Sequence, residues 1–422
     1  MPARRLPVHP DLTQLKHQAK DLLKAIRHGD AEAVAELAAY HPHPVAADEA
    51  KLADAQLVLA RSYGASSWPR LVQSCQLIDA IWADDVDTVR HLVERHPYLL
   101  VEDAGIGGRN WGPPMSYAAN LGRDRMIMML YQMGARDLEH AIDRAALQGK
   151  VDTARMLHDL LGKPGVPAGS LGGPAYTLNK AGTALMLELG AKVVGPSGER
   201  LAPVDVVLES DSRRPDAKHA ILEMYVQHGL TLPDTPTMAL HRGRIDLLEA
   251  HLRRDPGLLK RTFGHKEIFP PDLGCHEDPL ATQGTPLDGT TLLHMCADFD
   301  EMEIARWLIE QGADVNTRAA VSAEGMGGHT ALYCAVVSQA AFWPNHQHRA
   351  DEAPIARLIL DQGADLTVRA TLRKRLHPGY DYHVVDRVYR DVTPYQWGVQ
   401  FEPKVFVSAT ALRLIEERGG AG

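Results

Sequence analysis

The chain has 422 residues, of which 45% are hydrophobic and 23% are charged. This composition is that of a folded protein and excludes extensive disorder. Acidic residues (54) outnumber Lys and Arg (45), the formal net charge is −9, and only 6% of residues are aromatic, so general nucleic-acid binding is not expected.

The start of the chain and its cysteines both favour a reducing compartment. Two early arginines are not followed by an apolar run, which argues against a conventional secretory signal. No run of about 18 apolar residues is present, so no membrane span is predicted. The four cysteines lie in no CxxC spacing, which predicts neither a disulfide framework nor a zinc site of the usual pattern. We therefore expect a cytoplasmic protein without a cofactor.

The first 76 residues predict a group of helices. Apolar residues recur at helical spacing from Leu12 to Ile26, with Asp11 as the N-cap and Gly29 as the stop. Further helices are predicted before residue 41, over residues 49–63, and from Ser67 onward. We expect residues 1–76 to form a helical cap that covers the exposed end of the array that follows.

From about residue 77 the sequence becomes periodic. The clearest unit, residues 288–316, reads DGTTLLHMCADFDEMEIARWLIEQGADVN, and residues 328–336 with 355–365 repeat its two halves. This pattern resembles the ankyrin repeat, in which a T-P-L-H-x-A-A helix is followed by a second helix ending in G-A-D-V-N. We count about nine units over residues 77–422, several of them degenerate. The resemblance implies an all-α fold, an α-solenoid of stacked ankyrin repeats in which each helix pair buries its apolar face against its neighbours.

Long insertions interrupt this periodicity. They cover residues 100–112, 261–289, 318–328, 340–353 and 369–391, and four of the five occupy the turns that project as fingers in ankyrin stacks. Long loops in compact proteins are commonly functional. We expect these finger-loop insertions to deepen the concave groove. Several segments, including residues 68–71, 327–333 and 389–394, also resemble a largely uncharacterised group of bacterial ankyrin-repeat proteins, which implies the fold and little chemistry.

The candidate residues for acid–base catalysis lie in the insertions and in the first helices of the repeats. His265 or His276 could act as a general base oriented by Glu277, because histidine titrates near neutral pH. Their spacing with Cys275 matches no zinc motif, so no metal site is predicted. His294 stands where ankyrin repeats carry a histidine that bonds between repeats, and a structural role is the favoured alternative. The full catalytic set is His265, His276, Glu277, His294, Asp298, His329 and Tyr333.

A second set of residues would position a ligand. Residues after the Ala-Ala step face the concave groove in ankyrin repeats, which here selects His241, Arg242, Asp298 and Gln400; a merely solvated polar face is the alternative. A basic stretch over residues 369–390 could hold an anion or be a solvated finger. The ligand-binding set is Arg109, Trp111, His241, Arg242, Tyr380 and Gln400.

Two functions follow as hypotheses. The first is a binding module that takes a protein partner on its concave face and enlarged fingers. The second is a small-molecule-binding enzyme, an acid–base hydrolase, lyase or isomerase, with a pocket formed by the insertions and the concave helices. No phosphate loop or dinucleotide fingerprint is present, which makes redox chemistry the less expected reaction type.

Overall fold

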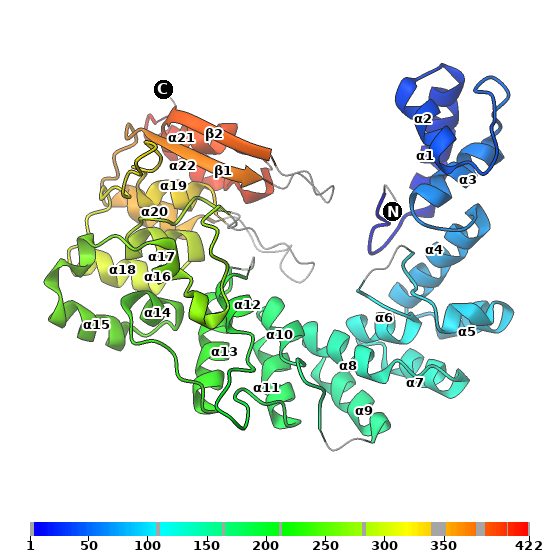
Figure 1. The fold of residues 1–422 in the computed structure, drawn as a ribbon, viewed down its shortest axis with the longest axis horizontal. Coiled ribbons are helices and arrows are strands. Elements are labelled where there is room, and N and C mark those ends of the chain that lie inside the picture. The colour runs from blue at the N-terminus through cyan, green and yellow to red at the C-terminus, as the bar shows by residue number, and fades with distance from the viewer. Residues whose placement is uncertain are drawn as a thin grey trace. The chain divides into compact units, whose positions relative to one another are not determined.

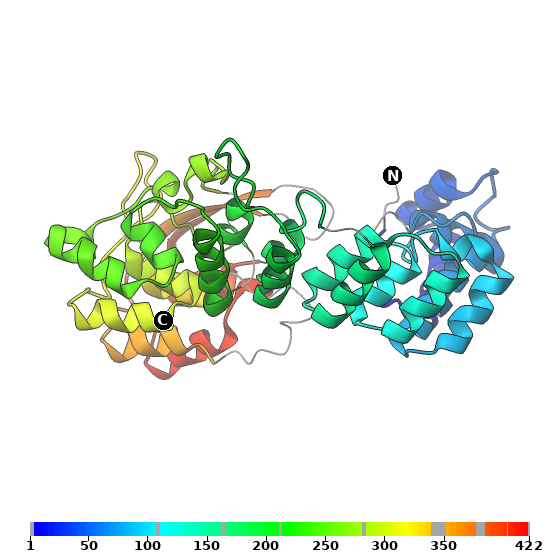
Figure 2. The same cartoon turned by 90° about the horizontal axis from the view of Figure 1, so that it is seen from below.

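The computed structural model describes residues 4–106, 110–162, 165–210, 213–280, 284–338, 352–376, 385–402 and 404–420. Two compact units divide the chain, Met1–Pro167 and Ala168–Gly422, and each is considered by itself (Figures 1 and 2). Both units consist mainly of short helices joined by tight turns. The fold is therefore all-α, as predicted, apart from one small hairpin in the second unit.

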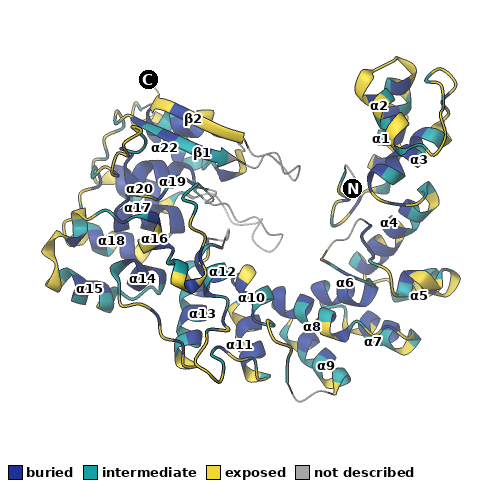
Figure 3. Ribbon diagram, viewed as in Figure 1, coloured by how far each residue is buried: buried dark blue, intermediate teal, exposed yellow. Residues whose placement is uncertain are grey.

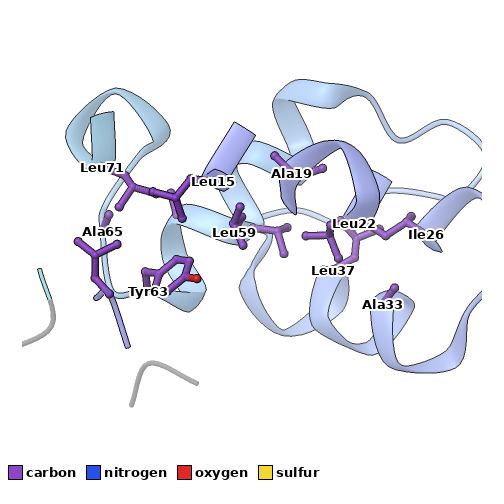
Figure 4. Packing of buried hydrophobic residues seen from close by; sticks show 14 of the residues in the cluster. Leu15, Ala19, Leu22, Ile26, Ala33, Leu37, Leu59, Tyr63, Ala65 and Leu71 are labelled. Carbon is purple, nitrogen blue, oxygen red and sulfur yellow. The ribbon is translucent and has the colours of Figure 1, made fainter. Parts of the chain in front are cut away.

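The first unit opens with helices that share a compact core. They are α1 (Leu12–Arg27), α2 (Ala31–Tyr40), α3 (Leu52–Ser62) and α4 (Trp68–Trp82). The Asp11 carboxylate accepts hydrogen bonds from the first turn of α1, which fixes where that helix starts. Leu15, Leu22 and Ile26 line one side of α1 and pack with Leu59 of α3 in this core (Figure 4). Residue 76, the predicted end of the cap, lies inside α4, so that boundary would cut a helix.

The rest of the first unit consists of antiparallel helix pairs. α4 pairs with α5 (Val86–Arg95), which leads into η1 (Pro97–Leu100); the next pairs are α6 (Pro114–Leu121) with α7 (Asp124–Met133), and α8 (Leu138–Leu147) with α9 (Val151–Leu161). Ala118 and Ala119 of α6 are fully buried, because small side chains let neighbouring first helices approach closely. Gly134 ends α7 in the left-handed conformation, with φ of 112°.

The second unit continues the same alternation. Its helices are α10 (Gly172–Tyr176), α11 (Lys180–Glu188), α12 (Val204–Leu208), α13 (Pro215–Gln227), α14 (Pro236–His241), α15 (Ile245–Arg254), α17 (Leu292–Phe299), α18 (Met302–Glu310), α19 (Ala331–Val336), α20 (Pro354–Asp361), α21 (Pro394–Gln400) and α22 (Ala409–Glu417), with η2 (Pro256–Lys260) after α15 and η5 (Lys404–Phe406) before α22. All residues of α17 are buried, whereas α18 buries only Ile304, Ala305 and Leu308. First helices are thus enclosed by the stack, and second helices keep one face in solvent (Figure 3).

Two insertions carry secondary structure that the sequence analysis did not predict. Residues 261–289 contain α16 (His265–Ile268) and η3 (Pro271–Leu273). Within residues 369–391, expected as a plain finger, the chain forms β1 (Ala370–Leu376) and β2 (Val385–Val392), an antiparallel hairpin. The alternating short runs of Val, Leu and Tyr with Arg and Asp suit a half-buried strand, a signal that the helical period of the neighbouring repeats obscured.

Candidate functional site

A cluster of buried ionisable side chains lies in the second unit. Asp298, at the end of α17, holds Arg213 in a fork: the guanidinium Nη2 lies 2.6 Å from Oδ2, and Nε lies 2.5 Å from the Asp298 carbonyl oxygen. Arg213 also donates to the Ser210 carbonyl at 2.9 Å. Both side chains are more than nine-tenths buried. This pairing joins the segment before α13 to a helix 85 residues further along the chain.

A second ion pair lies beside the first. Lys218 of α13 contacts Glu301, which precedes α18, with 3.0 Å between Nζ and Oε1. His219 approaches the same carboxylate oxygen at 3.0 Å. Both cations contact the ring of Phe299, whose centroid is 4.9 Å from the Arg213 guanidinium carbon and 4.3 Å from the Lys218 Nζ. Asp298, Phe299 and Glu301, from α17 and its exit turn, therefore contact cations that come from α13 and the segment before it.

Burial shifts the pKa values of the ionisable groups in this cluster. It raises the pKa of Asp298 and lowers the pKa of Lys218, because an apolar surrounding disfavours the charged form of each. Lys374 of β1 is fully buried, and burial lowers its pKa to about 8. Burial also opposes the charge of Glu301, but Lys218 and His219 outweigh it, so the pKa of Glu301 is lowered. Such shifts gather at functional sites, although structural ion pairs produce them too.

Asp298 Oδ1 is buried and has no hydrogen-bond partner among the residues that the structure describes. Gly284 lies against it, since a Cβ at this glycine would approach Oδ1 to 2.3 Å. A small cavity also opens onto the cluster, lined by Arg213, Lys218 and Phe299 together with residues of α12. The cavity has a volume of about 10 Å³, which is room for one water molecule, so the cluster is an enclosed polar region and not an open pocket.

His241 belongs to this buried region and does not face an open groove, which corrects the sequence-based expectation. It is fully buried at the end of α14, and its ring packs 5.0 Å from that of Phe299. Nε2 donates to the Ile268 carbonyl at 2.9 Å. Burial places the pKa of His241 well below its usual value, so the ring is neutral. Asp298 is likewise enclosed, because both residues lie on first helices that the stack covers on two sides.

The histidines at the repeat boundaries act as connectors. His294 accepts from the Thr291 hydroxyl at 2.9 Å and donates from Nε2 to the His329 carbonyl at 3.1 Å. His329 donates in turn to the Pro286 carbonyl at 3.0 Å. Burial lowers the pKa of His294 to about 4 and that of His329 to about 3, so both rings are neutral. His294 thus makes a hydrogen bond between repeats, which is the structural role that the sequence favoured for it.

Tyr333 fastens the hairpin to the array. Its hydroxyl lies 2.7 Å from the Val368 carbonyl oxygen and 2.6 Å from that of Val392, one before β1 and one at the end of β2. The rings of Tyr333 and His329 are 6.0 Å apart, so these two predicted neighbours do meet. Asp298, expected to converge with them, is instead paired with Arg213.

The remaining catalytic candidates lie in the 261–289 insertion and do not form a base with an orienting acid. His265 is buried and contacts the His276 carbonyl at 2.7 Å. His276 is exposed and pairs with Glu209 rather than Glu277, and this carboxylate raises its pKa. Glu277 pairs with Lys266, which lowers the pKa of Glu277. Whether any member of the catalytic set takes part in a reaction stays a prediction.

The ligand-binding candidates are distributed over both units. In the first unit, Trp111 packs on Trp82 and Tyr117, with ring centroids 6.3 and 4.7 Å apart. In the second, Arg242 pairs with Glu223 at 2.6 Å, and Gln400 is exposed at the end of α21. Arg109 and Tyr380 lie outside the described residues.

Sequence reasoning missed Arg213, Lys218 and Glu301. A signal existed for Lys218: it precedes Ile221, Leu222 and Tyr225 by three, four and seven positions, so it occupies the apolar face of α13. A lysine on a buried face requires a buried partner. Its partner Glu301 lies 83 positions away, and periodicity alone does not pair such distant residues.

Comparison with known proteins supports the repeat assignment. Residues 288–320, which contain α17 and α18, match the ankyrin repeat family. No curated protein matches the chain. Similar solved structures include the ankyrin repeat domain of human ASB11 (16% identity over 71% of this chain and 96% of that one, TM-score 0.26). Another is the ankyrin repeat domain of Bcl-3, a member of the IkappaB protein family (14% identity over 65% and 97%, TM-score 0.22).

The helix pairs and the matched repeat define the class of protein. The fold is an all-α solenoid of stacked ankyrin repeats with long insertions between them. None of the described helices is long and apolar enough to cross a membrane. Within the described ranges, no group of three His, Cys, Asp or Glu side chains is placed to hold a metal ion.

Proposed function

We propose that this protein is a cytoplasmic binding module that takes a protein partner on its concave face and enlarged fingers. The observation that carries the proposal is the attachment of the hairpin: Tyr333 contacts the chain on both sides of the strands, at Val368 and Val392. Binding residues commonly lie on projecting segments that a rigid scaffold positions. The hairpin is such a segment, and it exposes Val385 and Val388 to solvent.

The histidines support the same reading. His294 and His329 are buried, neutral and bonded to backbone carbonyls, which holds successive repeats together. A general base must reach a substrate proton, and an enclosed ring that already donates to a carbonyl is poorly placed to do so. Their role in the array leaves recognition to exposed residues of the insertions and of the first-helix ends.

Site-specific photo-crosslinking in the cells that make the protein tests the proposal. A photoreactive amino acid replaces Val388 on β2 or Gln400 at the end of α21, and Arg306 on the exposed side of α18 serves as the matched control. We expect discrete protein adducts from Val388 and Gln400 and none from Arg306. Equal adduct patterns at all three positions, or no protein adduct at all, would overturn the proposal.

A second candidate function, small-molecule binding, rests on the unpartnered Asp298 Oδ1. A donor group would satisfy this buried oxygen. The nearby cavity, lined by Arg213 and Lys218, has a volume of about 10 Å³, so a ligand larger than water would have to displace the residues that line it. Native mass spectrometry of the full chain tests this function. A retained small molecule that is lost in Asp298→Asn supports it, and a bare mass for the gently purified protein, unchanged in the variant, argues against it.

A further inference from the structure

The hairpin leaves one strand edge open. β1 pairs with β2 on one side, and on its other side Thr371 bridges to Gly327, whose N–H donates to the Thr371 carbonyl at 2.8 Å. Over the described parts of the chain, β2 pairs with β1 alone. An exposed edge presents backbone N–H and C=O groups that another extended chain can pair with.

The side chains of β2 do not close this edge. Its positions are exposed except Tyr389, which packs on Trp397 with ring centroids 4.8 Å apart, and Val392 (Figure 3). Tyr389 thus fixes the strand to α21, while Val388, 39% exposed on the opposite face, remains in solvent. The strand is held in place, and no other described strand pairs with its outer edge.

The hairpin is also cationic within an acidic protein. Apart from the buried Lys374, its described residues, 369–376 and 385–392, contain five cations and two carboxylates, an excess of three positive charges, and Arg375 also pairs with Asp278 outside the hairpin. The carboxylates are engaged: Asp386 pairs with Arg373 at 2.9 Å and Asp391 with Arg369 at 3.3 Å. On β2, neither Arg387 nor Arg390 has an ion-pair partner among the described residues. Arg387 lies opposite Lys374 in the regular part of the hairpin, and Arg390 follows Tyr389, where the pairing register shifts.

From this arrangement we propose that β2 is a docking edge for an extended, acidic segment of a partner protein, which adds as a third strand beside it. Backbone pairing would supply the affinity, and acidic side chains of the added strand would meet Arg387 and Arg390. The positive charges also oppose pairing between two copies of the hairpin, so they select a partner of opposite charge. This inference rests on the proposed protein-binding function and assigns its surface and partner chemistry.

Peptide binding to the full chain tests the docking edge. The probe is a fluorescently labelled eight-residue peptide of alternating Glu and Val, as long as β2, measured by fluorescence anisotropy. Two further peptides carry N-methyl groups on the Glu residues or on the Val residues. Alternate amides of a strand face the same neighbour, so one methylated peptide should lose binding and the other should keep it. Equal binding by both, or no binding by the unmodified peptide, overturns the proposal.

Charge reversal on the protein provides a second test of the docking edge. Arg387→Glu with Arg390→Glu should weaken binding of the unmodified peptide by about tenfold or more, because opposed charges become like charges. Arg125→Glu, an exposed change in the first unit, is the matched control and should leave binding unchanged. Hydrogen exchange of β1 amides confirms that the hairpin is intact in the double variant. Tighter binding of a single-stranded oligonucleotide than of the peptide would show that the edge prefers phosphates, and would overturn the assignment.

The protein-binding function and the β2 docking edge can be contradicted independently of each other. If photo-crosslinked partners persist in the Arg387→Glu, Arg390→Glu protein, protein binding stands and the β2 docking edge is wrong. If neither form yields a protein adduct, the protein-binding function itself is wrong.

Discussion

Lys218 and Glu301 form an ion pair with 3.0 Å between Nζ and Oε1, and both side chains are more than nine-tenths buried. Taking two charges out of water is costly, and their mutual attraction offsets this cost only while both are present. His219 supplies a further contact to the same carboxylate. The pair therefore makes the packing of α13 on the turn before α18 sensitive to the loss of either member.

Breaking this pair should destabilise the protein. We expect Lys218→Met to lower the free energy of unfolding by about 3 kcal/mol, because Glu301 would be left as a buried charge with one partner. The double variant Lys218→Met, Glu301→Leu should recover most of that loss. Urea-induced unfolding measures both effects. Lys266→Met, which removes the exposed partner of Glu277, is the control and should cause no measurable change.

Lys374 should make stability depend on alkaline pH. Its pKa falls from 10.5 in the unfolded chain to about 8 in the folded one, so the unfolded state binds more protons between these values and stability rises with pH. We expect the unfolding free energy of the wild type, relative to Lys374→Met, to rise by an amount on the order of 3 kcal/mol between pH 8 and pH 10.5. Urea unfolding at several pH values checks this; a constant difference would contradict a buried, shifted lysine.

His294 should make the stability of the protein depend on pH in the acidic range. Its pKa is about 4 in the folded protein and 6.5 in the reference state, so the unfolded chain takes up the proton first. The contribution of His294 to the unfolding free energy is fully present above pH 6.5. About 3 kcal/mol of it is lost as the pH falls toward 4. His294→Gln should show a shallower loss over that interval in urea unfolding. A slope identical to that of the wild type would refute the assignment.

Removing the Tyr333 hydroxyl should loosen the hairpin. Tyr333→Phe leaves the Val368 and Val392 carbonyls without this donor, at a cost of about 1–3 kcal/mol. Amide hydrogen exchange in β2 should become faster, while that in α17 should change less. Tyr395→Phe, whose hydroxyl contacts Glu416 at the surface, is the matched control. Unchanged exchange in β2 of Tyr333→Phe would mean that the hydroxyl does not hold the hairpin.

Much of the array could be predicted because its signals are local. The motif around residues 288–316 predicts α17 and α18, since repeat periodicity and the Gly312 turn lie within one unit. The structural bond of His294 follows from the same motif. The hairpin was missed because it lies inside an insertion with no repeat to compare it with.

The site was less predictable because its partners are distant in sequence. Asp298 was selected for its place on a first helix, but its burial and its pairing with Arg213 depend on how the segment before α13 meets α17. The same stacking encloses His241 against Phe299. Residue types and spacing indicate which side chains can carry charge, whereas packing between repeats decides which of them are covered.

The two carbonyls that meet at Tyr333 bear on which changes in hairpin length the protein can accept. Because Val368 and Val392 meet one hydroxyl, the insertion leaves the array and returns to it at nearly the same point. Residues added or removed between β1 and β2 therefore do not alter the spacing of the helices on either side. The hairpin can therefore be lengthened, shortened or replaced while the stacked repeats keep their register.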